Sequence, residues 1–368
     1  MELFEHTTTM SGVSLPAAYY ETPLHCTGAS FMSVWLPLRQ RTPPLGVYRD
    51  RIAMAKKFRV MASLVTAGGL PGWFPTCCLC PTHVFELPTA SPALGAMSSE
   101  LVHNELRGLI VLAHGHSDGP LVLAHVCERL AASGFVVAAP CFSDSHANED
   151  PAVVQNGRAF LPEQTILRAH AMDACIALLR ETYPGLANRP TALLGYSMGS
   201  DTIRQMQLDC PRVYIGGPGW VQSVTGADRM VAETSAPAGP SLQLLASPDG
   251  LMDLYQLTAD KSSMLTGYAH PGERSRVTVA DFDGVMKRVG GPPKHLRVDF
   301  EPFGHGDFKY PPFEKVEIQA WRSGFCGVNP WSPCGRDIDD ATVEQRATLG
   351  GTVIIRWLLA AMPAATSS

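Results

Sequence analysis

The stretch Ala192-Leu193-Leu194-Gly195-Tyr196-Ser197-Met198-Gly199 decides the fold. It begins as a short apolar run typical of a buried strand, and residues 201–209 after it suit a helix. The Gly-x-Ser-x-Gly pattern predicts a turn so tight that a Cβ on Gly195 or Gly199 would collide with the chain. Such a turn lifts the Ser197 side chain clear of the sheet, and the helix behind it directs N–H groups at the same point. We therefore expect Ser197 to be a nucleophile; a plain Gly-Ser loop is the alternative.

Strands and helices alternate on both sides of this stretch. Strands are expected at residues 109–113, at 134–140, where a β-branched run ends at Pro140, and at 192–195, 213–216, 242–246 and 296–300. Helices are expected at 120–132, at 163–181 with Ile166, Ala169, Met172, Ile176 and Leu179 on its buried side, and at the C-terminus after a cap at Asp340. This order predicts an α/β fold with a mostly parallel central sheet and helices on both faces. Ligands bind such sheets at the carboxyl ends of the strands.

The N-terminal part has a different composition. Residues 1–105 are rich in Pro, Gly, Thr and Ser, with short strand-like runs at 31–36 and 83–87. We interpret them as edge strands and loops of the same domain, with residues 106–368 as the catalytic core. No secretory signal is evident at Met1, because Glu2 and Glu5 lie in the first stretch and no apolar core follows.

Composition and charge exclude several classes of protein. Apolar residues make up 45% and charged residues 17% of the chain, as in globular proteins. The formal net charge of −5, without a basic run, argues against a nucleic-acid partner.

The ten cysteines form no disulfide framework in a chain of this length. Four lie in or beside apolar segments and are expected in the core: Cys127, Cys141, Cys175 and Cys210. Another group, Cys77, Cys78, Cys80 and His83, has no second ligand pair at zinc-finger spacing, so we expect no metal. Cys326 and Cys334 are the pair expected to bridge in an oxidising compartment.

One internal segment is unusually apolar. Residues 60–85 contain no Asp, Glu, Lys or Arg. A spanning helix is a poor interpretation, because glycines and prolines interrupt the segment. Peripheral membrane contact is one interpretation, and ordinary packing against the domain is the other.

A serine hydroxyl needs a neighbouring base to become a nucleophile. His305 lies between two glycines just after the strand expected at 296–300, where it can reach over the serine. His270 and His295 are its rivals. Asp249, in a turn after the strand expected at 242–246, is the acid expected to orient His305, with Asp253 as its rival. The order Ser, Asp, His matches that expected of this architecture, although either aspartate could instead cap a turn.

The developing negative charge on the substrate oxygen requires two backbone N–H donors. We expect one from Met198, directly after the serine, and one from His116. His116 lies in the run His114-Gly115-His116-Ser117, where Gly115 allows a sharp turn after the strand expected at 109–113. The His116 side chain is expected to face solvent or substrate and has no proton-transfer role. No cofactor is expected.

Residues 106–362 resemble the α/β-hydrolase superfamily. Within it, the His-Gly-His-Ser loop, the run 134–140 and the helix with Arg168 and Asp173 resemble the branch of chlorophyllases, platelet-activating-factor acetylhydrolases and dienelactone hydrolases. The tail from Cys326 through Cys334 into a final helix resembles chlorophyllase ends. The acid position departs from chlorophyllases, because residues 215–219 contain no carboxylate. Tyr196 and Met198 also replace the His and Arg that chlorophyllases tend to have beside the serine.

The resemblance implies an α/β-hydrolase fold and hydrolysis of a carboxylic ester, on a small-molecule or lipid-like apolar substrate, without metal or organic cofactor. Substrate choice would come from residues 141–162 and 217–240, which are long enough to form pocket walls and include Trp220, Met230 and Val231. Simple packing is the alternative role of those three side chains. A catalytically silent binding protein with the same fold is the alternative function, and a membrane-tethered interaction protein is a third.

Overall fold

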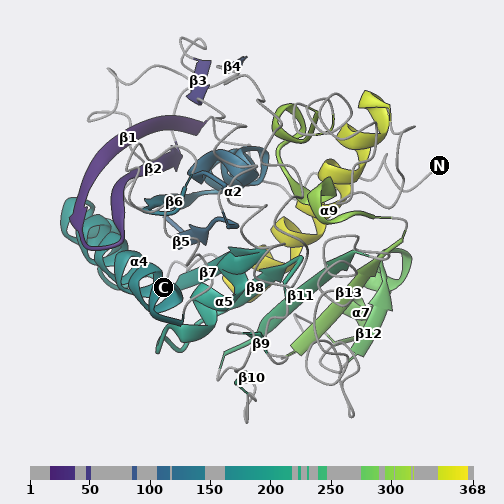
Figure 1. The fold of residues 1–368 in the computed structure, drawn as a ribbon. Coiled ribbons are helices and arrows are strands. Elements are labelled where there is room, and N and C mark those ends of the chain that lie inside the picture. The colour runs from purple at the N-terminus through teal and green to yellow at the C-terminus, as the bar shows by residue number, and fades with distance from the viewer. Residues whose placement is uncertain are drawn as a thin grey trace.

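A nine-stranded sheet forms the centre of the protein (Figure 1). The computed structural model describes residues 17–37, 47–50, 85–88, 106–116, 118–145, 162–217, 223–224, 230–231, 239–246, 275–289, 295–301, 303–315, 318 and 339–363. The strands, in spatial order, are β1 (Ala17–Cys26), β2 (Ala29–Pro37), β6 (Phe135–Phe142), β5 (Gly108–Ala113), β7 (Thr191–Tyr196), β8 (Arg212–Ile215), β11 (Ser241–Ala246), β13 (His295–Phe300) and β12 (Ser275–Thr278). From β6 to β12 all neighbours are parallel, whereas β1 and β2 add an antiparallel hairpin at the β6 edge. This arrangement confirms the predicted α/β class with a mostly parallel sheet.

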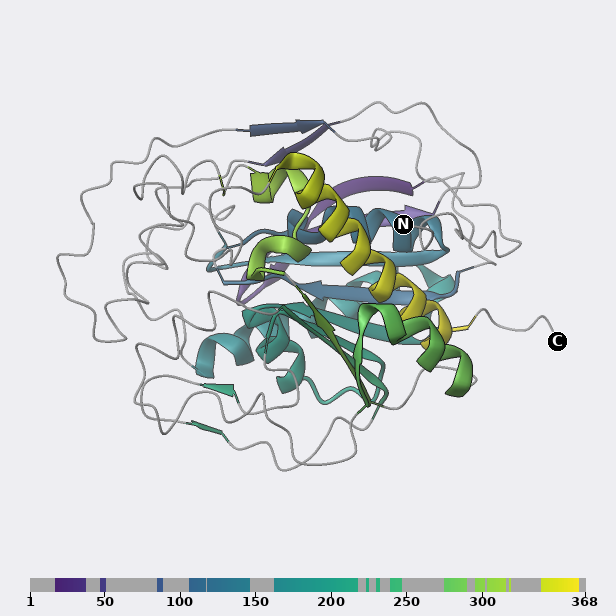
Figure 2. The ribbon, with the colours of Figure 1, turned by 90° about the vertical axis from the view of Figure 1, so that its right-hand side faces the viewer.

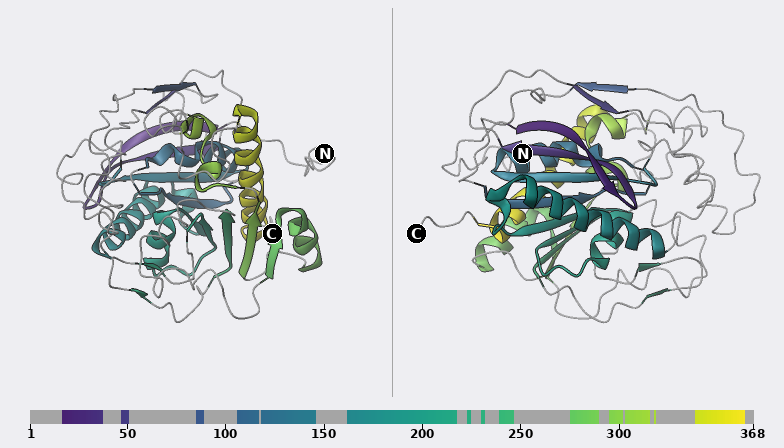
Figure 3. Two further views of the ribbon diagram at one scale, coloured as in Figure 1. Left: turned by 45° about the vertical axis from the view of Figure 1, so that its right-hand side comes forward. Right: turned by 90° about the vertical axis from the view of Figure 1, so that its left-hand side faces the viewer.

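Helices cover both faces of the sheet (Figures 2 and 3). The helical segments are η3 (Pro120–Leu123), α2 (Ala124–Ala132), α4 (Pro162–Thr182), η4 (Pro184–Leu186), α5 (Met198–Gln205), α7 (Val279–Val289), η6 (His305–Phe308) and α9 (Asp340–Ala361). Two small ribbons pair β3 (Val47–Asp50) with β4 (Phe85–Pro88) and β9 (Ser223–Val224) with β10 (Met230–Val231). No helix in the described ranges is long and apolar enough to cross a membrane.

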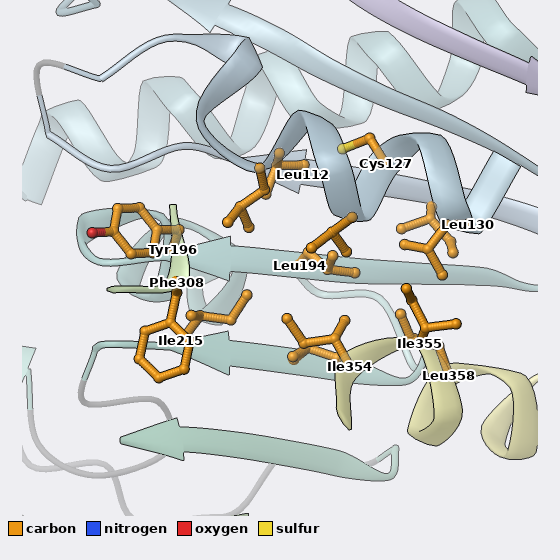
Figure 4. Packing of buried hydrophobic residues seen from close by; sticks show 14 of the residues in the cluster. Leu112, Cys127, Leu130, Leu194, Tyr196, Ile215, Phe308, Ile354, Ile355 and Leu358 are labelled. Carbon is orange, nitrogen blue, oxygen red and sulfur yellow. The ribbon is translucent and has the colours of Figure 1, made fainter. Parts of the chain in front are cut away.

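The core has two halves, because side chains alternate between the faces of each strand. Ile110 and Leu112 of β5 pack with α2 and α9, whereas Leu109 and Val111 pack with α4 and α5. Figure 4 shows the first half, where α2 and α9 meet over the central strands and Tyr196 lies at the arrowhead end of β7. Both faces of the central strands are therefore covered by helices, which leaves the strand ends as the place where a ligand is expected.

Most predicted elements are found within one to four residues of their expected ends, with three corrections. Strand β6 does not stop at Pro140 but continues to Phe142. Its ladder with β5 ends at Ala138, so Pro140 lies where the strand has a partner on one side only. The cap of α9 is Asp339 rather than Asp340, because its side chain accepts the Thr342 N–H at 2.7 Å.

The third correction concerns the buried side of α4. Ala169, Met172, Ile176 and Leu179 are buried as predicted, but Ile166 is 42% exposed. Thr165 and Arg168 are buried in its place. The first turn of α4 therefore points polar side chains into the protein, which the spacing of apolar residues in the sequence did not indicate.

The four cysteines predicted in the core, Cys127, Cys141, Cys175 and Cys210, are buried, and none of these four forms a disulfide. Other predictions lie outside the described residues: the cluster at 77–83, nearly all of the segment 60–85, and Cys326 and Cys334. Strand β12 and helix α7 were not predicted, because Ser275–Thr278 has no apolar run that would indicate a strand.

Candidate active site

Ser197 occupies a strained turn between β7 and α5. Its φ of 52° and ψ of −123° make it the non-glycine residue with positive φ in the described part of the chain. That conformation costs free energy in an L-residue and persists only where the surroundings hold it. The Ser197 N–H donates to Ile215 O at 2.8 Å, and Ser197 O accepts from Ser200 N at 2.8 Å. The turn is therefore anchored to β8 and to its own helix.

The two glycines of this turn are required for the reason the sequence suggested. A Cβ on Gly195 would overlap Gly199 O, and a Cβ on Gly199 would overlap Ala113 O. Ser200, directly after these residues, is buried, and its hydroxyl donates to Gly195 O at 3.0 Å. We call residues 195–199 the serine turn.

The loop after β5 lies directly against the serine turn. A Cβ built on Gly115 would lie 3.2 Å from Ser197 Cβ and 3.1 Å from Tyr196 Cδ1. A side chain at this position would crowd both residues, and its absence brings the Gly115 backbone close beside Ser197. We call residues 114–118 the β5 loop; Ser117 within it lies outside the described residues.

His114 supports the β5 loop from inside. Its Nδ1 lies 2.8 Å from Gly115 O, and its Nε2 lies 3.2 Å from the Phe142 nitrogen, whose N–H donates to it. These partners assign a neutral ring with the proton on Nδ1. Burial, together with the nearby Arg168 guanidinium, lowers the pKa of His114 to about 3, which keeps the ring neutral.

A buried ion pair holds the same loop from behind. The Arg168 Nε donates to Asp144 Oδ1 at 2.9 Å, and its Nη2 contacts Asp144 Oδ2. The other side of the guanidinium donates to the carbonyls of His114, at 2.8 Å, and Gly115, at 3.2 Å. With these carbonyl oxygens turned toward Arg168, the loop is fixed in one orientation. Burial would raise the pKa of Asp144, but Arg168 and His116 together hold it well below its usual range.

Of the two orientations expected for the His116 side chain, toward solvent or toward substrate, the structure excludes the one toward solvent. His116 is 8% exposed, and its Nδ1 lies 3.3 Å from Asp144 Oδ2. The solvent-facing alternative is therefore wrong, because Asp144, two residues after the end of β6, supplies an inward acceptor that the sequence does not reveal.

His305 begins η6, just past β13, and lies beside the serine turn. The imidazole is buried, with its ring centre 5.4 Å from that of Tyr196, whose hydroxyl donates to His305 O at 2.9 Å. A Cβ on Gly216 would lie 3.2 Å from His305 Cε1, and Gly216 has a φ of +59°. Tyr196 directly precedes Ser197. Gly216 directly follows Ile215, whose carbonyl oxygen accepts the Ser197 N–H. His305 therefore contacts both flanks of the turn that carries Ser197.

Asp307 closes the turn that carries His305, which we call the histidine turn (residues 304–309). Its Oδ2 accepts from the Gly304 N–H and from Arg346 Nη1, both at 2.7 Å. The Asp307 side chain is fully buried, and Arg346 belongs to α9. The final helix therefore fixes the histidine turn, a role that the sequence did not indicate.

The other predicted residues divide into those that are excluded and those that are not described. His295 lies at the start of β13, where its Nδ1 is 2.8 Å from Ser241 Oγ. In a parallel sheet the strand starts lie at the edge opposite Ser197, so His295 cannot act on it. Asp249, Asp253, His270 and Trp220 lie outside the described residues, as do most of residues 141–162 and 217–240. Strand β11 ends at Ala246, beside Phe300 of β13, at the same edge as the serine.

No cluster of three or more His, Cys, Asp or Glu side chains in the described ranges could hold a metal ion.

Comparison with known proteins gives a distant structural likeness. No family model matches this sequence. No curated protein matches it either. Among solved structures, a ferulic acid esterase from Streptomyces cinnamoneus is similar, with 16% identity, 95% of this chain and 90% of that chain covered, and a TM-score of 0.48. The strand order, the parallel core and the Gly-Tyr-Ser-Met-Gly turn between β7 and α5 give this chain the α/β-hydrolase fold.

Proposed function

We propose that this protein is a serine hydrolase that cleaves a carboxylic ester through an acyl-enzyme. One observation carries the proposal: Ser197 is held at positive φ, with Gly115 on one side and the residues contacting His305 on the other. A strained backbone of this kind marks functional sites, because the surrounding structure must offset its cost.

In the proposed reaction, Ser197 Oγ attacks the ester carbonyl carbon while the His305 imidazole takes its proton. The carbonyl oxygen becomes an oxyanion, and the Met198 and His116 N–H groups stabilise it. Met198 suits this role because it is the first residue of α5, where backbone N–H groups have no partner within the helix. Donors of this kind contribute about 3 kcal/mol each to lowering the barrier.

Collapse of the tetrahedral intermediate breaks the bond to the alcohol, which leaves with the proton from His305. Water then attacks the acyl-enzyme with the same imidazole as base, releasing the acid and restoring Ser197. Asp249 is the proposed acid that keeps the His305 tautomer and stabilises the imidazolium. Its support is that β11 ends at Ala246, three residues earlier, beside β13.

The substrate class is proposed as an apolar ester, of the chlorophyllase-like, lipid-esterase, acetylhydrolase or dienelactone-hydrolase kind. Its support is the resemblance of the β5 loop, of β6 and of the helix with Arg168 to that branch. A turnover panel of short and long acyl esters, chlorophyll and acetylated phospholipids separates these classes.

A fluorophosphonate probe tests the mechanism directly. The wild-type protein is expected to be labelled stoichiometrically and to hydrolyse p-nitrophenyl butyrate, and Ser197→Ala is expected to lose both properties while keeping its fold. Ser133→Ala is the control. The Ser133 hydroxyl donates to Arg129 O between the end of α2 and the start of β6, and strand starts lie at the edge of the sheet opposite Ser197. An unlabelled wild-type protein would instead identify a silent binding protein of the same fold.

The acid is tested by two substitutions of equal chemistry. Asp249→Asn is expected to lower kcat by about 10⁴-fold, because an amide favours the wrong imidazole tautomer. Asp253→Asn is expected to retain activity within about threefold of wild type, because its carboxylate has no role in this mechanism. The reverse pattern would assign the acid to Asp253.

A further inference from the structure

Three segments of the proposed active site meet at one buried lysine. Lys309 ends the histidine turn, and its N–H donates to Gly306 O at 2.8 Å. Its ammonium Nζ lies 3.3 Å from Asp118 Oδ1 of the β5 loop. The same Nζ lies 5.8 Å from the ring centre of Tyr196, the residue before the nucleophile. The Lys309 ammonium thus lies against the β5 loop and the serine turn, while the Lys309 backbone belongs to the histidine turn.

Asp118 contacts the β5 loop at Gly115, the residue whose backbone lies beside Ser197. Its N–H donates to Gly115 O at 3.3 Å, which closes the loop. Its Oδ2 packs against Gly115 so closely that a Cβ on that glycine would overlap it. A shift of the Asp118 carboxylate would therefore move the peptide that lies beside Ser197.

Tyr196 links the same cation to the imidazole. Its ring faces the Lys309 ammonium, and its hydroxyl donates to His305 O at 2.9 Å. A backbone bond reinforces the junction nearby, since the Tyr310 N–H donates to Val122 O at 2.7 Å. The histidine turn is thus held to the β5 loop by a charge pair, and the residue after the turn is held to the chain that follows the loop by a backbone bond.

A buried ion pair is a poor device for stability, because removing both charges from water costs about as much as their attraction returns. The side chains of Lys309 and Asp118 are only 7% and 8% exposed. Catalysis, in contrast, depends steeply on geometry, and a misplacement of about 1 Å costs about 100-fold in rate. An ion pair that joins a donor loop to the turn of the base suits that requirement.

We propose that Lys309 is a positioning residue for ester hydrolysis, which acts with Asp118 to hold the β5 loop, the serine turn and the histidine turn in register. The inference rests on the proposed function and adds to it a link between the oxyanion donors and the base. Neither side chain takes part in bond making.

The test compares Lys309→Met, Asp118→Asn, the double variant and Lys309→Arg. For each we would measure kcat and KM with p-nitrophenyl butyrate, the rate constant of fluorophosphonate labelling at Ser197, and the thermal unfolding midpoint. Each single variant is expected to lower kcat and the labelling rate by about 10- to 100-fold, with KM changed less than about threefold. The double variant is expected to be no slower than the slower single variant, because both changes remove the same link. Lys309→Arg is expected to recover most of the rate, because arginine also reaches the carboxylate.

Lys315→Met is the matched control. Lys315 follows in the same segment and pairs with Glu344 at 2.7 Å, away from the serine turn, so its loss is expected to leave kcat and the labelling rate unchanged. The double variant leaves neither charge buried alone, so it keeps the test valid if a single variant unfolds. Wild-type rates in folded Lys309→Met, or rate losses that multiply in the double variant, would overturn the inference alone. Failure of the wild-type protein to react would remove the proposed function and this inference with it.

Discussion

At the scale of single residues, Gly216 has a φ of +59°, and its Cα lies against the His305 imidazole. A Cβ there would lie 3.2 Å from His305 Cε1, closer than an ordinary contact, and the left-handed conformation costs a non-glycine residue about 1–2 kcal/mol. We therefore expect Gly216→Ala to lower the free energy of unfolding by about that amount. Because the ring must also move, we expect kcat to fall about tenfold, measured on p-nitrophenyl butyrate.

Gly351→Ala is the control for this substitution. Gly351 lies in α9, where a Cβ would come 3.3 Å from a methyl group of Val126. Alanine favours a helix over glycine by about 1 kcal/mol, which offsets the small shift required of the Val126 methyl group, so we expect wild-type kcat and an unfolding midpoint close to that of the wild type. Full activity of Gly216→Ala would show that the imidazole does not depend on contact with Gly216.

At the scale of elements, α4 acts on the site through one side chain of its first turn. We expect Arg168→Met to lower the free energy of unfolding by about 3–5 kcal/mol, because Asp144 would lose its guanidinium partner while buried. The carbonyls of His114 and Gly115 would each lose the hydrogen bond that Arg168 donates, so kcat should fall as well. Urea unfolding and ester turnover measure the two effects.

Arg180→Met, on the same helix, is the matched control, since Arg180 donates to Thr191 Oγ1 at 3.0 Å, at the start of β7 and far from its serine end. We expect a loss of no more than about 1 kcal/mol from it and no change in kcat. If Arg168→Met instead unfolded like the wild-type protein, Asp144 would not depend on the guanidinium in solution.

Elements with strong apolar runs could be predicted from the sequence, and those that depend on tertiary contacts could not. Strand β7 and the serine turn follow from local patterns, because steric rules fix both. The length of β6 past Pro140 depends on where the ladder with its neighbour β5 ends, which no local pattern shows. The exposure of Ile166 follows from Arg168, because the helix turns that side chain inward to reach Asp144.

At the scale of the whole molecule, the site residues that could be predicted are those that lie shortly after the carboxyl end of a strand. Ser197 and His305 follow from chain order and from the rule that parallel strands end at one edge. Asp118, Lys309 and Asp307 resemble surface charges in the sequence, and only the fold buries them against partners 39 and 191 residues away along the chain. Charge pairs between loops therefore need a structure to be recognised.

The dependence of stability on pH tests the burial of two histidines across the fold. Burial lowers the pKa of His125 to about 4, and burial together with Arg168 lowers that of His114 to about 3, from 6.5 in an exposed residue. Below pH 6.5 the unfolded chain binds protons that the folded protein does not, so stability is full above pH 6.5 and falls as the pH drops toward 4. Each group contributes about 1.4 kcal/mol per pH unit, or about 3 kcal/mol for His125 over that window.

His125→Phe is therefore expected to reduce the loss of stability between pH 6.5 and 4 by about 3 kcal/mol, measured by urea unfolding at several pH values. A phenyl ring can keep the stacking on Tyr310, whose ring centre lies 6.0 Å away. His170→Gln is the control, because His170 is exposed on α4 and meets solvent in the folded and unfolded states alike. An equal slope in His125→Phe and in the wild-type protein would mean that the imidazole takes up its proton within the fold, and that its burial between α2 and the Tyr310 ring does not keep it neutral.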